Sequence, residues 1–331
     1  MRAFIFFIVA LLFITGCGTK RQYYKPEITD GKVSFDGRIP SQLKDVSLYG
    51  SSLDNGMVLS KDGVEDKIKI DEKDTFFGKF NNKIVYSTYD NVLHVNYTDG
   101  SSFYEKQMSS IVATASIDGS SLAVISADNT LFLIDTSKDS ILFQRKMDDI
   151  SAVDSRIAVP YFLGSLVIFP TLDGKLTIVD RYSGSLIRNV VVSAELNFNN
   201  IIFLDVVADR MIAATAKRAL SINPRGINFI DEEIKDALLK DDKVYLFTKD
   251  GRVLLTDLDL KVIKENKYPF AIFSGVILDK TLNIVEKRGF LIQTDLNLEN
   301  EKVFNFPTEI DKSIFIGNNK IYYDSSFYTV E

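Results

Sequence analysis

A unit that recurs along most of the sequence limits the folds open to this chain more than any other feature. It is clearest in residues 165–192, where an apolar run, Asp173-Gly174, a second apolar run, Ser183-Gly184 and a third apolar run follow one another. Eight such units begin near residues 57, 84, 122, 166, 210, 243, 280 and 320, and neighbouring starts lie 27 to 44 residues apart. Periods near 40 residues with about four strands each are typical of propeller blades.

A propeller explains such a repeat, because a four-stranded blade exposes an apolar face on each side and a closed ring of blades covers both faces. We therefore predict an all-β fold, a propeller of seven or eight blades with eight preferred. The third strand of each unit should lead outward, and the next blade should begin with a strand such as 157–161. The last unit has only three strands, so we expect a segment near 33–35 or 46–49 to complete it and cover an exposed edge.

The turns and buried faces of the blades can also be predicted. Asp173-Gly174, Asp128-Asn129 and Asp250-Gly251 separate apolar runs, and these residue types tolerate the positive φ of a two-residue hairpin. We expect each pair to join two strands. The side chains expected to be buried next to these turns are Leu131, Leu133, Leu176 and Ile178.

The first seventeen residues resemble a bacterial lipoprotein signal. A positive start at Met1-Arg2 and an apolar run over residues 3–13 precede Ile14-Thr15-Gly16-Cys17, which is similar to a lipobox. The apolar run is too short to span a bilayer comfortably. We predict that the signal peptide is cleaved before Cys17, and that this cysteine carries acyl chains such as palmitate, two or three of which hold a protein stably on a membrane.

This start divides the chain into three predicted parts: a signal peptide over residues 1–16, a lipidated cysteine and flexible tether over 17–30, and a single propeller domain over 31–331. Gly18 follows the cysteine, where an aspartate retains many Gram-negative lipoproteins in the inner membrane. We therefore expect a lipid-anchored protein on the periplasmic face of the outer membrane. The inner membrane and the cell surface are the alternatives.

The stretch from 156 to 187, RIAVPYFLGSLVIFPTLDGKLTIVDRYSGSLI, resembles the PQQ-type repeat of quinoprotein propellers. With the lipobox, it is similar to the BamB family, the propeller lipoproteins of the outer-membrane β-barrel assembly machinery. The final NKIYYDSSFYTVE also resembles the last hairpin of that family. The resemblance is sharp over about residues 120–260, and it implies a propeller that binds other envelope proteins.

The residue types that most cofactor and metal sites need are scarce. The chain has no tryptophan, one cysteine and one histidine, His94, which argues against a quinone cofactor and a zinc site. No Gly-x-Ser-x-Gly elbow occurs. The carboxylate clusters lie where turns are expected, and we interpret them as solvated turns: Asp148-Asp149, 231–233, Asp241-Asp242 and 295–299. We therefore predict no cofactor, no metal and no enzymatic activity.

Recognition through loops between blades is the remaining possibility. In the BamB family the partner-binding loop has an arginine shortly before the proline that opens the next blade, and the nearest match here is Arg156 before Pro160. A solvated blade-edge role is the alternative for Arg156. A net charge of −6 argues against a nucleic-acid partner.

We therefore expect a monomeric periplasmic scaffold lipoprotein that binds other envelope proteins and assists outer-membrane protein assembly. A propeller that binds a small ligand, a cell-wall glycan or a host molecule is the second hypothesis. A hydrolase or lyase with its active site in the central channel is the third hypothesis. It ranks last because the sequence offers no set of catalytic residues for it.

Overall fold

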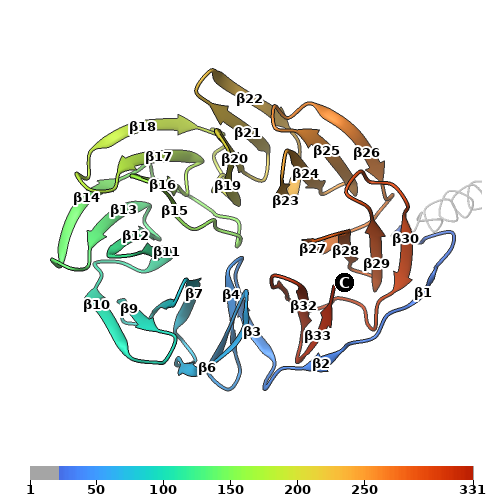
Figure 1. Cartoon of the computed structure of the whole chain (residues 1–331), viewed down its shortest axis with the longest axis horizontal. Helices are drawn as coiled ribbons and strands as arrows, with labels where there is room; N and C mark the ends of the chain where they lie inside the picture. Colours follow the sequence, from blue (N-terminus) through green and yellow to red (C-terminus); the bar gives the residue numbers. More distant parts are fainter. Residues whose placement is uncertain (1–21, 331) are drawn as a thin grey trace, which may run out of the picture.

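The computed structural model describes residues 22–330, and every regular element in that range is a β-strand. Eight sheets surround a central channel and form a closed ring (Figure 1). The all-β class and the preferred count of eight blades are confirmed. Seven of the eight predicted repeat starts lie at the second strand of a blade. The start near 57 lies at the third strand, because the polar second strand, Gly50–Leu53, gives no apolar signal.

The blades follow the chain, and each runs from an innermost to an outermost strand. The strands of blades 1 to 4 are β3 (Leu43–Val46), β4 (Gly50–Leu53), β5 (Met57–Ser60) and β6 (Gly63–Lys69); β7 (Thr75–Phe80), β8 (Lys83–Ser87), β9 (Val92–Tyr97) and β10 (Ser102–Gln107); β11 (Val112–Asp118), β12 (Ser121–Ser126), β13 (Thr130–Asp135) and β14 (Ser140–Lys146); and β15 (Tyr161–Leu163), β16 (Leu166–Pro170), β17 (Lys175–Asp180) and β18 (Leu186–Val191).

The strands of blades 5 to 8 are β19 (Phe203–Val207), β20 (Arg210–Ala214), β21 (Arg218–Asn223) and β22 (Gly226–Asp231); β23 (Ile234–Lys240), β24 (Lys243–Thr248), β25 (Arg252–Asp257) and β26 (Val262–Lys267); β27 (Phe273–Leu278), β28 (Leu282–Glu286), β29 (Phe290–Thr294) and β30 (Lys302–Asn305); and β31 (Ile314–Ile316), β32 (Lys320–Tyr323) and β33 (Ser326–Thr329). In blades 2 to 6 the third strand of the predicted unit is the outermost strand, as expected. The first strand of blade 4 was predicted at 157–161, which is wrong: β15 begins at Tyr161, and 157–160 contains no strand.

The hydrophobic core is divided among the seams between blades. Eight apolar clusters are present within the described residues, and each lies between two neighbouring blades. The predicted core positions Leu131, Leu133 and Leu176 are fully buried, and Ile178 is 9% exposed. The second and third strands of most blades are buried on both faces, because both faces contact a neighbouring blade.

Two short strands near the N-terminus complete the outer edges of the last blades. β2 (Gly37–Arg38) pairs antiparallel with β33 and gives blade 8 its fourth strand. β1 (Gly31–Lys32) pairs parallel with β30 as a fifth strand of blade 7. An N-terminal strand therefore closes the ring, but both predicted positions for it were wrong. Val33 and Phe35 pack against the cluster between blades 7 and 8, and residues 43–46 form the innermost strand of blade 1.

The segment before β1 contacts blade 7. Tyr24 is 8% exposed and packs edge-on against Tyr268 and Phe290, with ring centroids 6.1 and 5.7 Å apart. The main-chain N–H of Asp30 donates to the carbonyl of Val303 (2.7 Å). The part of the expected tether that lies within the described residues is therefore packed on the domain, and the propeller's contacts begin before residue 31.

The predicted turns join strands, but with a different geometry from a two-residue hairpin. At Asp173-Gly174 only the glycine has positive φ, +81°. Its N–H donates to the carbonyl of Thr171, and the Thr171 hydroxyl donates to Asp173 (2.5 Å). This is a type I turn that ends in a left-handed residue. Ser126 with Asp128 and Thr248 with Asp250 repeat the side-chain bond in blades 3 and 6.

Candidate functional site

One face of the ring carries a set of exposed apolar side chains. The strands of each blade alternate in direction, so the loops between blades and the turns between second and third strands lie on the same face, here called the loop face. The large apolar side chains exposed there are Tyr89, Ile111, Leu196, Phe198, Phe270 and Ile272. Exposed apolar groups that gather on one surface are typical of protein interaction sites.

Two loops of this face are hydrogen-bonded to each other. Residues 147–160 connect β14 to β15, and residues 192–202 connect β18 to β19. The Phe198 N–H donates to the Ala152 carbonyl (2.9 Å), and the Asn200 side chain accepts from the Asp154 N–H (2.6 Å). These bonds hold Leu196, 88% exposed, and Phe198, 53% exposed, above the ring.

Arg156 lies in an inter-blade loop, as predicted, but its side chain lines the central channel. The guanidinium binds Asp154 through two hydrogen bonds (2.9 and 2.6 Å), and the Arg156 side chain is only 17% exposed. Burial alone would raise the pKa of Asp154, but the hydrogen bonds and charge of Arg156 outweigh burial and lower it. Arg156 is therefore a half-buried ion-pair partner, and its role in binding a partner stays a prediction.

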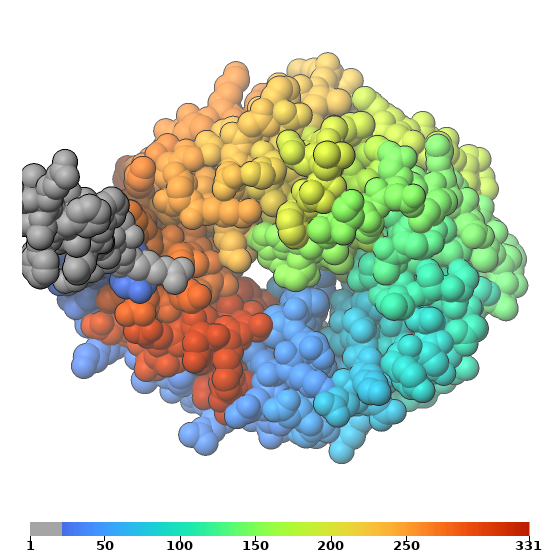
Figure 2. All heavy atoms as spheres, turned by 180° about the vertical axis from the view of Figure 1, so that it is seen from behind, coloured from blue at the N-terminus to red at the C-terminus, as the bar shows by residue number. Residues whose placement is uncertain are grey.

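The channel contains a cavity of about 550 Å³. Figure 2 shows one face of the ring with a narrow opening at its centre. The β3–β4 hairpin, Ser47-Leu48-Tyr49, lines the cavity at the end of the channel opposite to the loop face. Burial raises the pKa of Tyr49 to about 12, although a hydrogen bond with the Val159 main chain opposes the shift.

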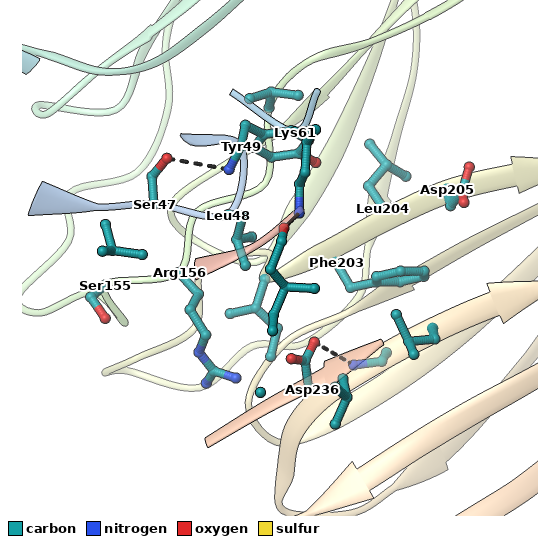
Figure 3. A pocket seen from close by; sticks show the side chains of 18 of the residues that line it. Ser47, Leu48, Tyr49, Lys61, Ser155, Arg156, Phe203, Leu204, Asp205 and Asp236 are labelled. Atoms are coloured by element: carbon teal, nitrogen blue, oxygen red, sulfur yellow. Dashed lines mark hydrogen bonds between the residues drawn. The ribbon is translucent and has the colours of Figure 1, made fainter. Parts of the chain in front are cut away.

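Three polar groups approach the cavity from blades 1, 5 and 6 (Figure 3). The Lys61 ammonium donates to the Ile316 carbonyl (2.6 Å), and burial lowers its pKa to about 8 against the opposing charge of Asp236. Burial also raises the pKa of Asp236 and of Asp205. Each of these carboxylates accepts a hydrogen bond from the next residue's N–H, at 2.9 and 2.7 Å.

These cavity residues were not predicted from the sequence. A signal for two of them exists, because Asp205 and Asp236 are acidic residues inside the apolar runs of β19 and β23. A charged side chain inside an otherwise apolar strand that faces a channel often belongs to a functional site. Lys61 gives no such signal, because it lies in an ordinary β5–β6 turn.

The other groups singled out from the sequence have ordinary surroundings. His94 lies in β9, stacks on Tyr86 and approaches Glu105 (3.4 Å). The carboxylate clusters lie at strand ends or in connections, and the 295–299 turn is held by bonds to Asp295. Within residues 22–330 no three His, Cys, Asp or Glu side chains are placed to hold a metal ion. No helix in that range is long and apolar enough to cross a bilayer. Cys17 lies outside the described residues.

A search against protein-family models finds no match for this chain. The sequence is similar to two curated proteins named plasminogen-binding protein PgbB, from Helicobacter pylori strains J99 and 26695. Each is 29% identical over 98% of this chain and 70% of the relative. The alignment therefore includes the whole propeller.

Among solved structures, BamB from Moraxella catarrhalis is similar in fold. It superimposes with a TM-score of 0.66 over 90% of this chain and 99% of that protein, at 16% identity. The WD40 domain of Sif2 gives the same TM-score at 12% identity. Such low identities establish the fold alone. The chain is thus an eight-bladed β-propeller that is similar in fold to BamB and similar in sequence to the plasminogen-binding protein PgbB.

Proposed function

We propose that this protein is a membrane-tethered propeller that binds another protein through its loop face and makes or breaks no bond. The observation that carries the proposal is the similarity to PgbB along 98% of the chain. The exposed Leu196 and Phe198, held by the bonds between their loop and 147–160, supply the apolar anchors that protein interfaces need.

Anchoring at Cys17 is part of the proposal. Gln22, where the described residues begin, lies five positions after Cys17, and five steps of extended chain span at most about 18 Å. Because Tyr24 is packed on blade 7, a lipid at Cys17 would hold the disc close to the bilayer. Replacing Cys17 with serine should release the protein from the detergent phase, and retention of acyl labelling in this variant would contradict the anchor.

Plasminogen is the first candidate partner, because it is the ligand in the name of the relatives. We would measure binding of immobilised plasminogen to the full-length protein in lipid nanodiscs. Leu196→Asp with Phe198→Asp should weaken binding at least tenfold, since desolvated anchors dominate such interfaces. The matched control is Ile187→Asp with Val191→Asp, two equally apolar residues exposed on outer strand β18. Equal loss in both double variants would contradict binding through the loop face.

A component of the outer-membrane barrel assembly machinery is the second candidate partner. Two observations favour it: the BamB-like fold and the lipobox-like start. Crosslinking in intact envelopes, followed by identification of captured proteins, separates the candidates. Capture of a barrel assembly protein by the wild type, but not by the loop-face double variant, would support this partner. Cleavage of the protein by protease added to intact cells would instead place the loop face at the cell surface.

A further inference from the structure

The opening of the channel on the loop face is more basic than the rest of the molecule. Five basic and two acidic side chains line it, whereas the whole chain has 39 basic and 45 acidic residues. The basic residues are Arg156, Lys235, Lys249, Lys287 and Lys312. A local excess of positive charge on an acidic protein attracts anions to this opening.

Three of the five basic side chains form no close ion pair within residues 22–330, although the charges of Asp154 and Asp236 act on Lys235. Lys312 binds Asp324 (2.7 Å), but Lys235, Lys249 and Lys287 form no ion pair with a carboxylate there. Burial and the nearby Arg156 lower the pKa of Lys235. The buried Nη1 of Arg156 also lacks an acceptor. An unpaired buried donor is costly, so an anion at this opening would satisfy Arg156 Nη1, and the exposed Lys249 and Lys287 would attract it by charge.

The cavity behind this opening has an apolar wall. Phe203, Leu204, Val276 and Ile314 are among its lining residues, and Arg156 lines both the cavity and the opening. A cavity of about 550 Å³ with apolar walls and a few polar groups is typical of a small-molecule site. The Leu48-Tyr49 hairpin lines its far end.

We propose that the channel binds a small amphipathic anion, with a carboxylate or phosphate head at Arg156, Lys235, Lys249 and Lys287 and an apolar body in the cavity. This site adjoins the protein-binding surface, because Phe198 lines the opening whereas Leu196 lines neither the opening nor the cavity. The size of the cavity favours a small molecule over an acidic peptide, which would use the basic opening but leave the apolar wall empty.

The probe for the test is pyrenebutyrate, which joins an apolar fluorescent body to a carboxylate. Titration into the full-length protein in nanodiscs, with empty nanodiscs as the blank, should give saturable binding with a Kd on the order of 10 µM for a ligand of this size. Pyrenebutanol lacks the charge and butyrate lacks the body, so each should bind at least tenfold more weakly. Raising the salt concentration should also weaken pyrenebutyrate binding.

The variant Lys249→Gln with Lys287→Gln should raise the Kd at least tenfold, because it removes two head contacts that have no partner in the fold. Lys261→Gln with Lys302→Gln removes two lysines that line neither the cavity nor its opening, and it should leave the Kd unchanged. Leu204→Trp, which fills the cavity, should abolish binding, with the melting temperature as the check on folding.

Equal binding of pyrenebutyrate and pyrenebutanol, unaffected by the Lys249 and Lys287 changes, would overturn the site. Binding of a hexaglutamate peptide without binding of pyrenebutyrate would overturn it in favour of an acidic peptide. The single variant Leu196→Asp, at a residue that lines neither the cavity nor its opening, should weaken plasminogen binding and bind pyrenebutyrate like the wild type. Loss of plasminogen binding and loss of probe binding are therefore independent results.

Discussion

Gly174 connects the blade repeat to the loop face, and its substitution by alanine should be costly. The residue has φ +81°, which disfavours any L side chain by about 1–2 kcal/mol. An added Cβ would lie 2.7 Å from both Asn199 Cγ and the Ser193 carbonyl oxygen. The Asn199 amide donates to the carbonyls of Asp173 and Ser193 (2.9 Å each). Displacing it removes two hydrogen bonds, each about 1 kcal/mol.

Gly174→Ala should therefore lower the free energy of unfolding by about 3–4 kcal/mol. The matched control is Gly164→Ala in the same blade, where φ is +57° but no atom lies within 4 Å of an added Cβ, so about 1–2 kcal/mol is expected. Urea titration followed by circular dichroism measures both. Losses that agree within about 0.5 kcal/mol would refute the packing of Asn199 against this turn, since only backbone strain would then remain.

Three further predictions concern stability. Leu131→Ala, at a fully buried position in the seam between blades 3 and 4, should cost about 2–5 kcal/mol in a urea titration, and a cost below about 1 kcal/mol would contradict the seam. Tyr24→Ala should cost about 2–3 kcal/mol and speed cleavage after Glu27 by a glutamyl endopeptidase, because it removes the edge contacts with blade 7; an unchanged cleavage rate would show that this segment is not held. Burial opposes the shift, but bonds to Lys175 and Thr171 hold the pKa of Asp173 below its usual 3.8, so its stabilisation is present above about pH 4 and lost as pH falls through the folded-state value. Asp173→Asn should therefore flatten the fall in melting temperature below about pH 4, and parallel curves would contradict the shift.

The blade pattern could be predicted because its signals are local. Asp-Gly and Asp-Asn turns between apolar runs fix a hairpin within about ten residues, and Leu131 and Leu176 were recognisable as core positions for that reason. The closing strand Gly37–Arg38 was missed because it is two residues long, has no apolar pattern and pairs with a strand near the other end of the chain.

The candidate site was less predictable because it depends on contacts between distant residues. Arg156 was identified from its position before Pro160, but its place in the channel follows from the path of 147–160, which is held by Asn200. Lys61 and Asp236 line one cavity although 175 positions separate them in the sequence. Only ring closure brings such groups together.

Binding of another protein through the loop face is the central claim, and hydrogen exchange of the propeller with and without plasminogen tests it most directly. The account predicts slower exchange in 150–158, 193–202 and 269–272, the loops that carry or support Leu196, Phe198 and Ile272. Outer strands β14, β18 and β22 should exchange as in the free protein. Protection confined to those outer strands, or no protection at saturating plasminogen, would contradict the claim.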